Sequence, residues 1–308
     1  MKIINKLKNK LIAFDRKVKL SKTVKNELIN WQTILRTETP MEKINRTELV
    51  NSIKLLDNKI GKCTNSWDEY RQRFRFCILK NDPRNFLRWD PVIETMYAGI
   101  NKCELDYLMD ADWSKWSKAI KETWVGNPSK YKYYKYSSSN FINMAYNLAQ
   151  LVEHYGINIG KLDKIVEFGG GYGCMAKLAN NLGFQGTYTI FDIPELLSLQ
   201  KYYLNSNNLN SGFNFVETAE KFNDSDPDMF IATWSLSESP TSLREEFLNK
   251  LGKPKYILIA YQSQFDSIDN VVYFKKYREK RPDYVWANYE ITHLNKSKNY
   301  YLIGKKFL

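Results

Sequence analysis

Residues 164–173, Lys-Ile-Val-Glu-Phe-Gly-Gly-Gly-Tyr-Gly, combine a short apolar run, an acid and four glycines. The β-branched pair Ile165-Val166 predicts a buried parallel strand that ends at Glu167, and the apolar periodicity of 174–182 predicts a helix directly after the glycines. Glycines reach backbone angles closed to other residues and let a ligand approach the main chain, while a helix start offers free N–H groups. This strand, turn and helix predict a nucleotide-like ligand.

Two glycine patterns with different ligands fit this turn. Residues 171–176 satisfy the dinucleotide pattern G-x-G-x-x-G/A, and Asp192 follows at about the spacing that an NAD site requires. Residues 167–173 also satisfy acid-x-G-x-G-x-G, with Glu167 as the acid. An acid there can accept hydrogen bonds from ammonium and hydroxyl groups but repels a pyrophosphate. The acid therefore favours S-adenosylmethionine, which has an ammonium group and no phosphate, over NAD.

A second strand and helix follow the first pair. Residues 187–191 predict a strand with Asp192 at its carboxyl end, where a carboxylate can accept hydrogen bonds from both hydroxyls of a ribose. Pro194 starts the predicted helix 195–205, and the first helical turn is a position that favours proline. Both predicted strands thus end at an acid that suits an adenosyl ligand.

Three stretches of this sequence resemble a known family. Residues 166–173, 191–195 and 200–204 are similar to the first two motifs of the Rossmann-like S-adenosylmethionine-dependent methyltransferases. Their amino-acid sequences look most like those of the sugar O-methyltransferases of bacterial surface-polysaccharide gene clusters. The resemblance covers the chain from about residue 124 to the C-terminus, and it implies S-adenosylmethionine as the cofactor and a sugar hydroxyl as the methyl acceptor.

The cofactor roles follow from these motifs. We expect Glu167 to bind polar groups of the methionine or ribose, residues 169–173 to line the methionine chain, Asp192 to bind the ribose diol, and residues 217–218 to contact the adenine edge. The predicted cofactor-binding residues are Glu167, Gly169, Gly170, Gly171, Tyr172, Gly173, Asp192, Ile193, Glu217, Thr218, Thr233 and Trp234.

Alternating strands and helices continue after Asp192. The remaining predicted strands are 213–216, 229–233, 256–260 and a terminal hairpin of 285–293 and 300–307, with helices from 239–240 to 251 and over 271–280. We therefore expect a seven-stranded sheet that ends in one antiparallel strand, which distinguishes the methyltransferase type of Rossmann-like fold from the NAD-binding type. In such a sheet the ligands lie beyond the carboxyl ends of the parallel strands.

Methyl transfer to a sugar hydroxyl needs a group that takes the hydroxyl proton. His293 is the first candidate, because imidazole titrates near neutral pH and its strand reaches the ligand edge if 285–293 runs parallel to the others. Glu238 is the second candidate. A hydrogen-bonded hairpin histidine and a helix-start carboxylate near Ser239-Pro240 remain the structural alternatives for these two residues.

The segment before the first strand is predicted to be helical. Residues 1–147 form an α-helical N-terminal region, and 148–308 form the cofactor-binding domain. Within the first region, 124–140 is polar and rich in tyrosine, and the family resemblance implies a lid over the active site. Tyrosine rings and amide groups suit carbohydrates, so Tyr136 and Asn140, together with Gln262, are the predicted substrate-binding residues. An ordinary surface loop is the alternative for this segment.

Composition and charge limit the classes of protein to which this chain can belong. The chain has 308 residues, 43% of them hydrophobic, and a net charge of +12, of which residues 1–36 carry +8 through ten Lys and Arg against Asp15 and Glu27. Residues 1–22 predict a basic amphipathic helix that could contact an anionic membrane or simply cover the N-terminal region. Because the charge is concentrated at one end and no Asn-Pro-Pro-Tyr motif occurs, we do not expect a nucleic-acid substrate.

The cysteines and histidines indicate the cellular compartment and whether a metal site is expected. Cys63, Cys77, Cys103 and Cys174 show no C-x-x-C spacing, and only two histidines occur, so we expect free thiols and no metal site. With no long apolar run and no signal-peptide pattern, we expect a cytoplasmic protein.

The predicted activity is S-adenosylmethionine-dependent O-methylation of a sugar, whether free, nucleotide-linked or within a surface-glycan precursor. Two alternatives stay open. Phe-Asp-Ile-Pro at 191–194 also resembles the plant-type O-methyltransferase motif, which would mean an aromatic or secondary-metabolite acceptor. A catalytically silent cofactor-binding scaffold would carry the same motifs. The oligomeric state does not follow from the sequence.

Overall fold

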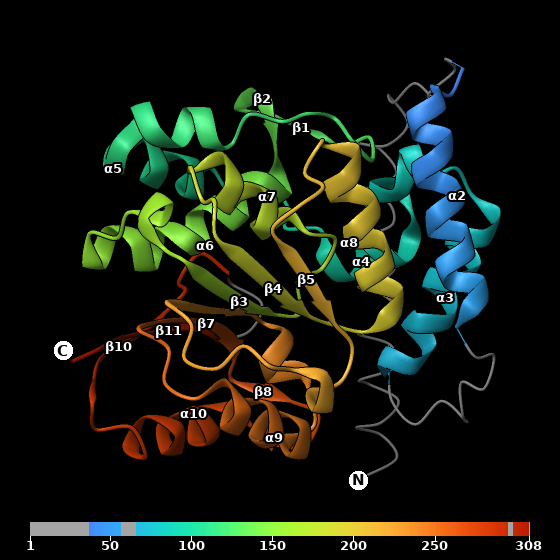
Figure 1. Cartoon of the computed structure of the whole chain (residues 1–308). Coiled ribbons are helices and arrows are strands. Elements are labelled where there is room, and N and C mark those ends of the chain that lie inside the picture. Colours follow the sequence, from blue (N-terminus) through green and yellow to red (C-terminus); the bar gives the residue numbers. More distant parts are fainter. Residues whose placement is uncertain (1–36, 57–65, 295–297, 308) are drawn as a thin grey trace, which may run out of the picture. The chain divides into compact units, whose positions relative to one another are not determined.

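A seven-stranded sheet carries the glycine turn in the computed structural model (Figure 1). Its strand order is β10-β11-β7-β6-β3-β4-β5. The bounds are β3 Lys164–Phe168, β4 Thr187–Phe191, β5 Phe213–Val216, β6 Met229–Thr233, β7 Tyr256–Gln262, β10 Tyr284–Glu290 and β11 Asn299–Lys306. β11 pairs antiparallel with β7 and β10, whereas the pairs from β7 to β5 are parallel. The predicted seven-stranded Rossmann-like sheet with its C-terminal antiparallel hairpin is confirmed.

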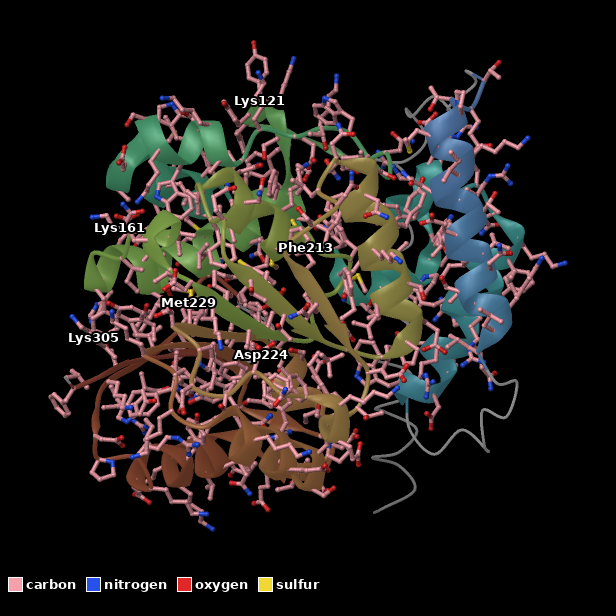
Figure 2. The ribbon with its side chains drawn as sticks, viewed as in Figure 1. Lys121, Lys161, Phe213, Asp224, Met229 and Lys305 are labelled. Carbon is pink, nitrogen blue, oxygen red and sulfur yellow. The ribbon has the colours of Figure 1, made fainter. Side chains whose placement is uncertain are left out.

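The sheet places one set of strand ends on a common edge. β10 runs in the same direction as β7, because each is antiparallel to β11. The carboxyl ends of all strands except β11 therefore lie together, and Phe213 and Met229, labelled in Figure 2, mark the opposite, amino ends of β5 and β6. β3, β6 and β7 are buried along most of their length, as expected for central strands covered on both faces.

Helices cover both faces of the sheet (Figure 1). α6 Ser139–Tyr155, α7 Cys174–Asn181 and α8 Pro194–Ser206 share one hydrophobic cluster with the preceding helical region. α9 Thr241–Leu251 and α10 Asn270–Glu279 share a second cluster with the other face. The observed helices and strands start and end within a few residues of the predicted bounds, which is the usual uncertainty of element ends.

The structure describes residues 37–56, 66–294 and 298–307, and those from Glu38 onward belong to one compact unit. The basic amphipathic helix predicted over 1–22, Cys63 and most of the predicted hairpin turn lie outside the described residues. In the part of the chain that is described, no helix is long and apolar enough to cross a membrane.

The region before α6 is helical, as predicted, with one exception. Its elements are α2 Pro40–Leu55, α3 Ser66–Lys80, η1 Pro83–Arg88, α4 Asp90–Met96 and α5 Lys102–Ala119. The exception is the tyrosine-rich segment, where β1 Lys130–Tyr131 pairs antiparallel with β2 Tyr134–Ser138. No strand was expected there, although tyrosine favours strands. α6 runs through position 147, so the predicted domain boundary at 147–148 falls inside a helix.

Candidate active site

The glycine turn follows β3 and has the backbone that its glycines allow. Gly169, Gly171 and Gly173 have φ angles of +75°, +57° and +95°, which side chains disfavour. A Cβ at Gly169 would overlap the side chain of Ser235, which follows β6. The turn is therefore in direct contact with the segment after the neighbouring strand, and a larger residue would separate the two.

Glu167 is buried beneath this turn. Only 1% of it is exposed, and its Oε2 accepts a hydrogen bond of 2.9 Å from the Tyr188 hydroxyl of β4. Burial raises the pKa of Glu167 to about 8, and the charge of Asp192 adds to this rise, while the Tyr188 bond opposes it. No cation among the described residues pairs with this carboxyl group, which is held next to the turn. A cationic ligand group would offset the cost of ionising it there.

Asp192 stands at the carboxyl end of β4, on the other side of the turn. Its Oδ1 accepts from the Ile193 N–H at 2.8 Å and its Oδ2 from Gln200 Nε2 at 2.7 Å. Burial raises the pKa of Asp192 to about 7 even though these bonds and the N–H groups of Gly170 and Gly171 lower it. Two carboxyl groups with raised pKa values therefore flank one glycine turn.

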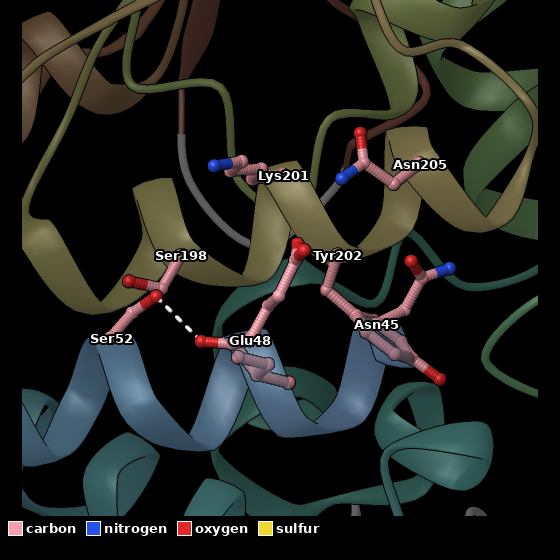
Figure 3. A pocket seen from close by; sticks show the side chains of 8 residues that line it. Asn45, Glu48, Ser52, Ser198, Lys201, Tyr202 and Asn205 are labelled. Carbon is pink, nitrogen blue, oxygen red and sulfur yellow. Dashed lines mark hydrogen bonds between the residues drawn. The ribbon is translucent and has the colours of Figure 1, made fainter. Parts of the chain in front are cut away.

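Gln200 was missed by the sequence analysis as a site residue. It lies on α8 and is fully buried, and its Nε2 also donates to the Gly171 carbonyl oxygen at 3.0 Å. The signal was a polar amide on the apolar face of α8, among Leu199, Tyr203 and Leu204. Its neighbours Ser198, Lys201, Tyr202 and Asn205 face the other way and line a shallow recess against α2 (Figure 3). Gln200 thus belongs to the side of α8 that faces the turn.

The other predicted cofactor residues differ in what their side chains do. The Tyr172 ring is buried against Phe86 and Tyr203, at centroid distances of 5.6 and 5.0 Å, so only its backbone can line the turn. Glu217 is exposed and pairs with Lys221. Thr218 and Ile193 are half-buried at the ends of β5 and β4.

Thr233 and Trp234 end β6 at the same edge. Trp234 has a φ of +66°, a strained value for a non-glycine residue, and its N–H donates to the Ala260 carbonyl oxygen at 2.7 Å. Its indole Nε1 donates to Asn299 Oδ1 at 3.4 Å. This backbone turns the chain from β6 into the short helix η4 Ser235–Glu238. The Ser235 hydroxyl at the start of η4 donates to the Phe168 carbonyl oxygen beside the glycine turn.

Glu238 ends η4 and is half-buried. The Gln262 amide lies 3.5 Å from its Oε1, and burial raises the pKa of Glu238 to about 7. Gln262, a predicted substrate residue, is itself held by the Ser237 hydroxyl at 2.8 Å. Among the described residues, the carboxyl group therefore has one weak hydrogen-bond partner, and its pKa is close to neutral pH.

A buried cation fixes the backbone on both sides of Glu238. Arg244 is fully buried, and it donates to the carbonyl oxygens of Ser237 at 2.6 Å and Ser239 at 2.8 Å. Its third contact is Asn270 Oδ1 at 2.8 Å, and Asn270 also donates to the Gln262 carbonyl oxygen. Sequence reasoning missed Arg244 and Asn270, because Arg244 acts on backbone oxygens and Asn270 lies 26 positions further along the chain.

His293 lies just past the carboxyl end of β10. Its Nε2 is 2.9 Å from Oε1 of Glu104, a buried residue of α5 that the sequence analysis did not single out. The same oxygen accepts from Asn143 Nδ2 at 2.9 Å, and the Tyr146 ring packs edge-on against the imidazole. His293 thus forms part of a hydrogen-bonded contact between α5, α6 and the end of β10.

The predicted substrate residues Tyr136, on β2, and Asn140, in the first turn of α6, occupy different surroundings. Tyr136 is 66% exposed, whereas Asn140 Oδ1 accepts a hydrogen bond from the Ala98 N–H at 3.0 Å. Arg88 anchors the start of the segment through the Asn127 carbonyl oxygen at 2.6 Å. The segment is therefore tied to the helical region at both ends, with tyrosine rings exposed between. Within the described residues, no group of three or more His, Cys, Asp or Glu could hold a metal ion.

The raised pKa of Glu167 predicts how the stability of the ligand-free protein varies with pH. The folded state retains a proton that the unfolded chain releases above about pH 4.5, so the folded state is favoured at low pH and loses this advantage as pH rises through about 8. Each pKa unit corresponds to about 1.4 kcal/mol. Glu167→Gln is therefore expected to increase the free energy of unfolding, relative to the wild type, by more at pH 8.5 than at pH 5.5 in urea titrations. An equal difference at the two pH values would contradict the assignment of the raised pKa.

The known proteins to which this chain is similar are solved structures of low sequence identity. No family model and no curated protein matches this chain. Among solved structures, a protein of Thermoplasma acidophilum is 18% identical with a TM-score of 0.41, over 55% of this chain and 89% of that one. A SAM-dependent methyltransferase of Aquifex aeolicus is 14% identical with a TM-score of 0.39, over 51% and 88%. The precorrin-6y C5,15-methyltransferase of Geobacter metallireducens is 16% identical with a TM-score of 0.38, over 53% and 87%.

Proposed function

We propose that this protein is an S-adenosylmethionine-dependent O-methyltransferase whose acceptor is a sugar hydroxyl. One observation carries the cofactor: two carboxyl groups with raised pKa values, those of the buried Glu167 and the half-buried Asp192, lie at the carboxyl ends of adjacent parallel strands beside one glycine turn. Ammonium, sulfonium and ribose hydroxyl groups would relieve the cost of burying these carboxyl groups, whereas a pyrophosphate would increase it. The position of β11 between β7 and β10 supports the same choice over NAD.

The sugar acceptor is supported by the sequence resemblance and by exposed tyrosines. Tyr133 and Tyr136 expose 48% and 66% of their surface in the segment that precedes α6. Aromatic rings can bind the C–H faces of a sugar, and the amides of Asn140 and Gln262 can match its hydroxyl groups. The segment would then contact the acceptor while the sheet edge holds the cofactor.

We assign Glu238 as the general base that takes the proton of the acceptor hydroxyl. A general base works best when its pKa lies near the working pH, and the pKa of Glu238 is raised to about 7 by burial. Glu238 also follows the strand next to β3, and η4 contacts the glycine turn through Ser235. His293 ranked first from sequence, but its Nε2 is already hydrogen-bonded to Glu104 beyond an edge strand. The geometry therefore supports Glu238 ahead of His293.

Calorimetry with S-adenosylhomocysteine tests the cofactor, and a radiolabelled methyl-transfer screen tests the acceptor. We expect binding of S-adenosylhomocysteine, none of NADH, and transfer to at least one member of a panel of nucleotide sugars and simple glycosides. A panel of catechols and flavonoids serves as the comparison. Binding without transfer to any panel member would contradict enzymatic methyl transfer, and transfer to phenols alone would contradict the sugar acceptor.

A further inference from the structure

Gln200 of α8 has no role in the chemistry described so far. We infer that Gln200 is a positioning residue of the cofactor site, which holds the Asp192 carboxylate against the glycine turn in the orientation that meets the ribose hydroxyls of the adenosyl ligand. This inference rests on the proposed function and adds a residue to it.

The contacts of the Gln200 amide link two parts of the site. One Nε2 hydrogen goes to Asp192 Oδ2 at 2.7 Å and the other to the Gly171 carbonyl oxygen at 3.0 Å. The other carboxylate oxygen of Asp192 accepts from the Ile193 N–H. Both oxygens are thus oriented by donors from different elements, and the donor from α8 is the one that also fixes the turn.

Packing alone does not account for a glutamine at this position. Gln200 is fully buried, and no described residue forms a hydrogen bond with its Oε1. An unpartnered buried acceptor opposes folding, whereas a methionine of similar length would fill the space without one. The hydrogen-bonding capacity of the amide is therefore the property that the site uses.

The glycine turn is built to lie against this side chain. A Cβ on Gly170 would be 3.2 Å from Gln200 Nε2, and a Cβ on Gly173 would be 3.7 Å from the Gln200 Cα atom. Gly170 would also bring its Cβ to 3.2 Å from Glu167 Oε2. The close approach between α8 and the turn therefore sets the distance from Gln200 to both carboxyl groups.

Gln200→Met tests the role by calorimetry with S-adenosylhomocysteine and with 5′-methylthioadenosine, which keeps the ribose diol and lacks the amino acid. We expect the affinity for both ligands to fall by a similar factor, roughly 10- to 100-fold, as for the loss of one hydrogen bond to a charged group. Weakening of S-adenosylhomocysteine alone would place Gln200 at the amino acid of the ligand and overturn the inference.

The pH dependence of affinity separates a positioning role from a structural one. The Gln200 bond lowers the pKa of Asp192, and the facing titratable groups are Glu167 and, behind it, Tyr188. Without the bond, Asp192 is expected to take up its proton at a higher pH. As pH is lowered, the affinity for S-adenosylhomocysteine should fall when Asp192 takes up its proton. In Gln200→Met this fall should therefore occur at a higher pH than in the wild type. A fall at the same pH in both proteins would overturn the inference.

Gln150→Met is the matched control. Gln150 is also a buried glutamine, on α6, where its Oε1 accepts from the Tyr289 hydroxyl at 3.1 Å away from the glycine turn. We expect this variant to change thermal stability without changing either affinity. If wild-type protein binds neither ligand, the proposed function fails; if wild type binds and Gln200→Met binds equally well, only the inference about Gln200 fails.

Discussion

Asp192→Ala is expected to abolish measurable binding of S-adenosylhomocysteine while the protein remains folded. Under the proposed function, a ribose diol would donate two hydrogen bonds to this carboxylate, and each hydrogen bond to a charged group contributes about 1.5–3 kcal/mol. Their loss would weaken binding by a factor of about a hundred or more. Calorimetry gives the affinity, and circular dichroism with a thermal scan shows whether the fold persists.

Asp228→Ala is the control for this variant. Asp228 is a half-buried aspartate that accepts from the N–H groups of Asp163 at 2.7 Å and Lys164 at 3.0 Å, at the amino end of β3. It lies on the opposite edge of the sheet from the glycine turn, so its loss is expected to lower stability without lowering affinity. Retained affinity in Asp192→Ala, or equal loss in both variants, would contradict the placement of the ribose at Asp192.

The residues that the sequence predicted well are those whose surroundings are local. Glu167 lies one residue before the end of β3 and Asp192 directly follows β4. The next few residues turn the chain into a helix in each case, so the position of both acids at the sheet edge follows from neighbours in the sequence. The antiparallel direction of β11 was also predictable, because the connection from β10 to β11 is too short for a parallel crossover. Local pattern was thus sufficient for the fold and for the place of the two carboxyl groups at the sheet edge, whereas their roles as cofactor ligands stay predictions.

Residues that act across the fold were not predictable in the same way. Gln200 contacts Gly171, 29 positions away, and Glu104 contacts His293, 189 positions away. In both cases a polar residue lies on the buried face of an amphipathic helix, which marks it as unusual but does not identify its partner. The rank of His293 changed for the same reason, since the Glu104 bond to its imidazole has no trace in the sequence.

Glu238→Gln is expected to lower kcat for sugar methylation by about 10²–10⁴-fold, the usual contribution of a general base. The amide keeps the shape of the side chain and its place near Gln262, so the affinity for S-adenosylhomocysteine should not change. Steady-state kinetics with an acceptor identified by the nucleotide-sugar screen gives kcat, and calorimetry gives the affinity. A fall in affinity that accounts for the lost rate would contradict a role as base.

The pH profile gives this prediction a second, independent readout. A carboxylate base is active when ionised, so the wild-type kcat should rise with pH through about 7, the pKa to which burial raises Glu238. Glu238→Gln should lose this rise. Because Arg244 holds the carbonyl oxygens on both sides of Glu238, the substitution is expected to leave the η4 backbone in place.

His293→Gln is the decisive comparison, because it changes the other candidate base without touching η4. If Glu238 takes the proton, His293→Gln should reduce kcat by less than about tenfold, since it removes only the imidazole contact between α5 and the end of β10. The opposite pattern, with a large loss in His293→Gln and none in Glu238→Gln, would assign the proton to the imidazole. Small effects in both variants would mean that neither group is the base, and that the bound geometry of hydroxyl and sulfonium supplies the rate.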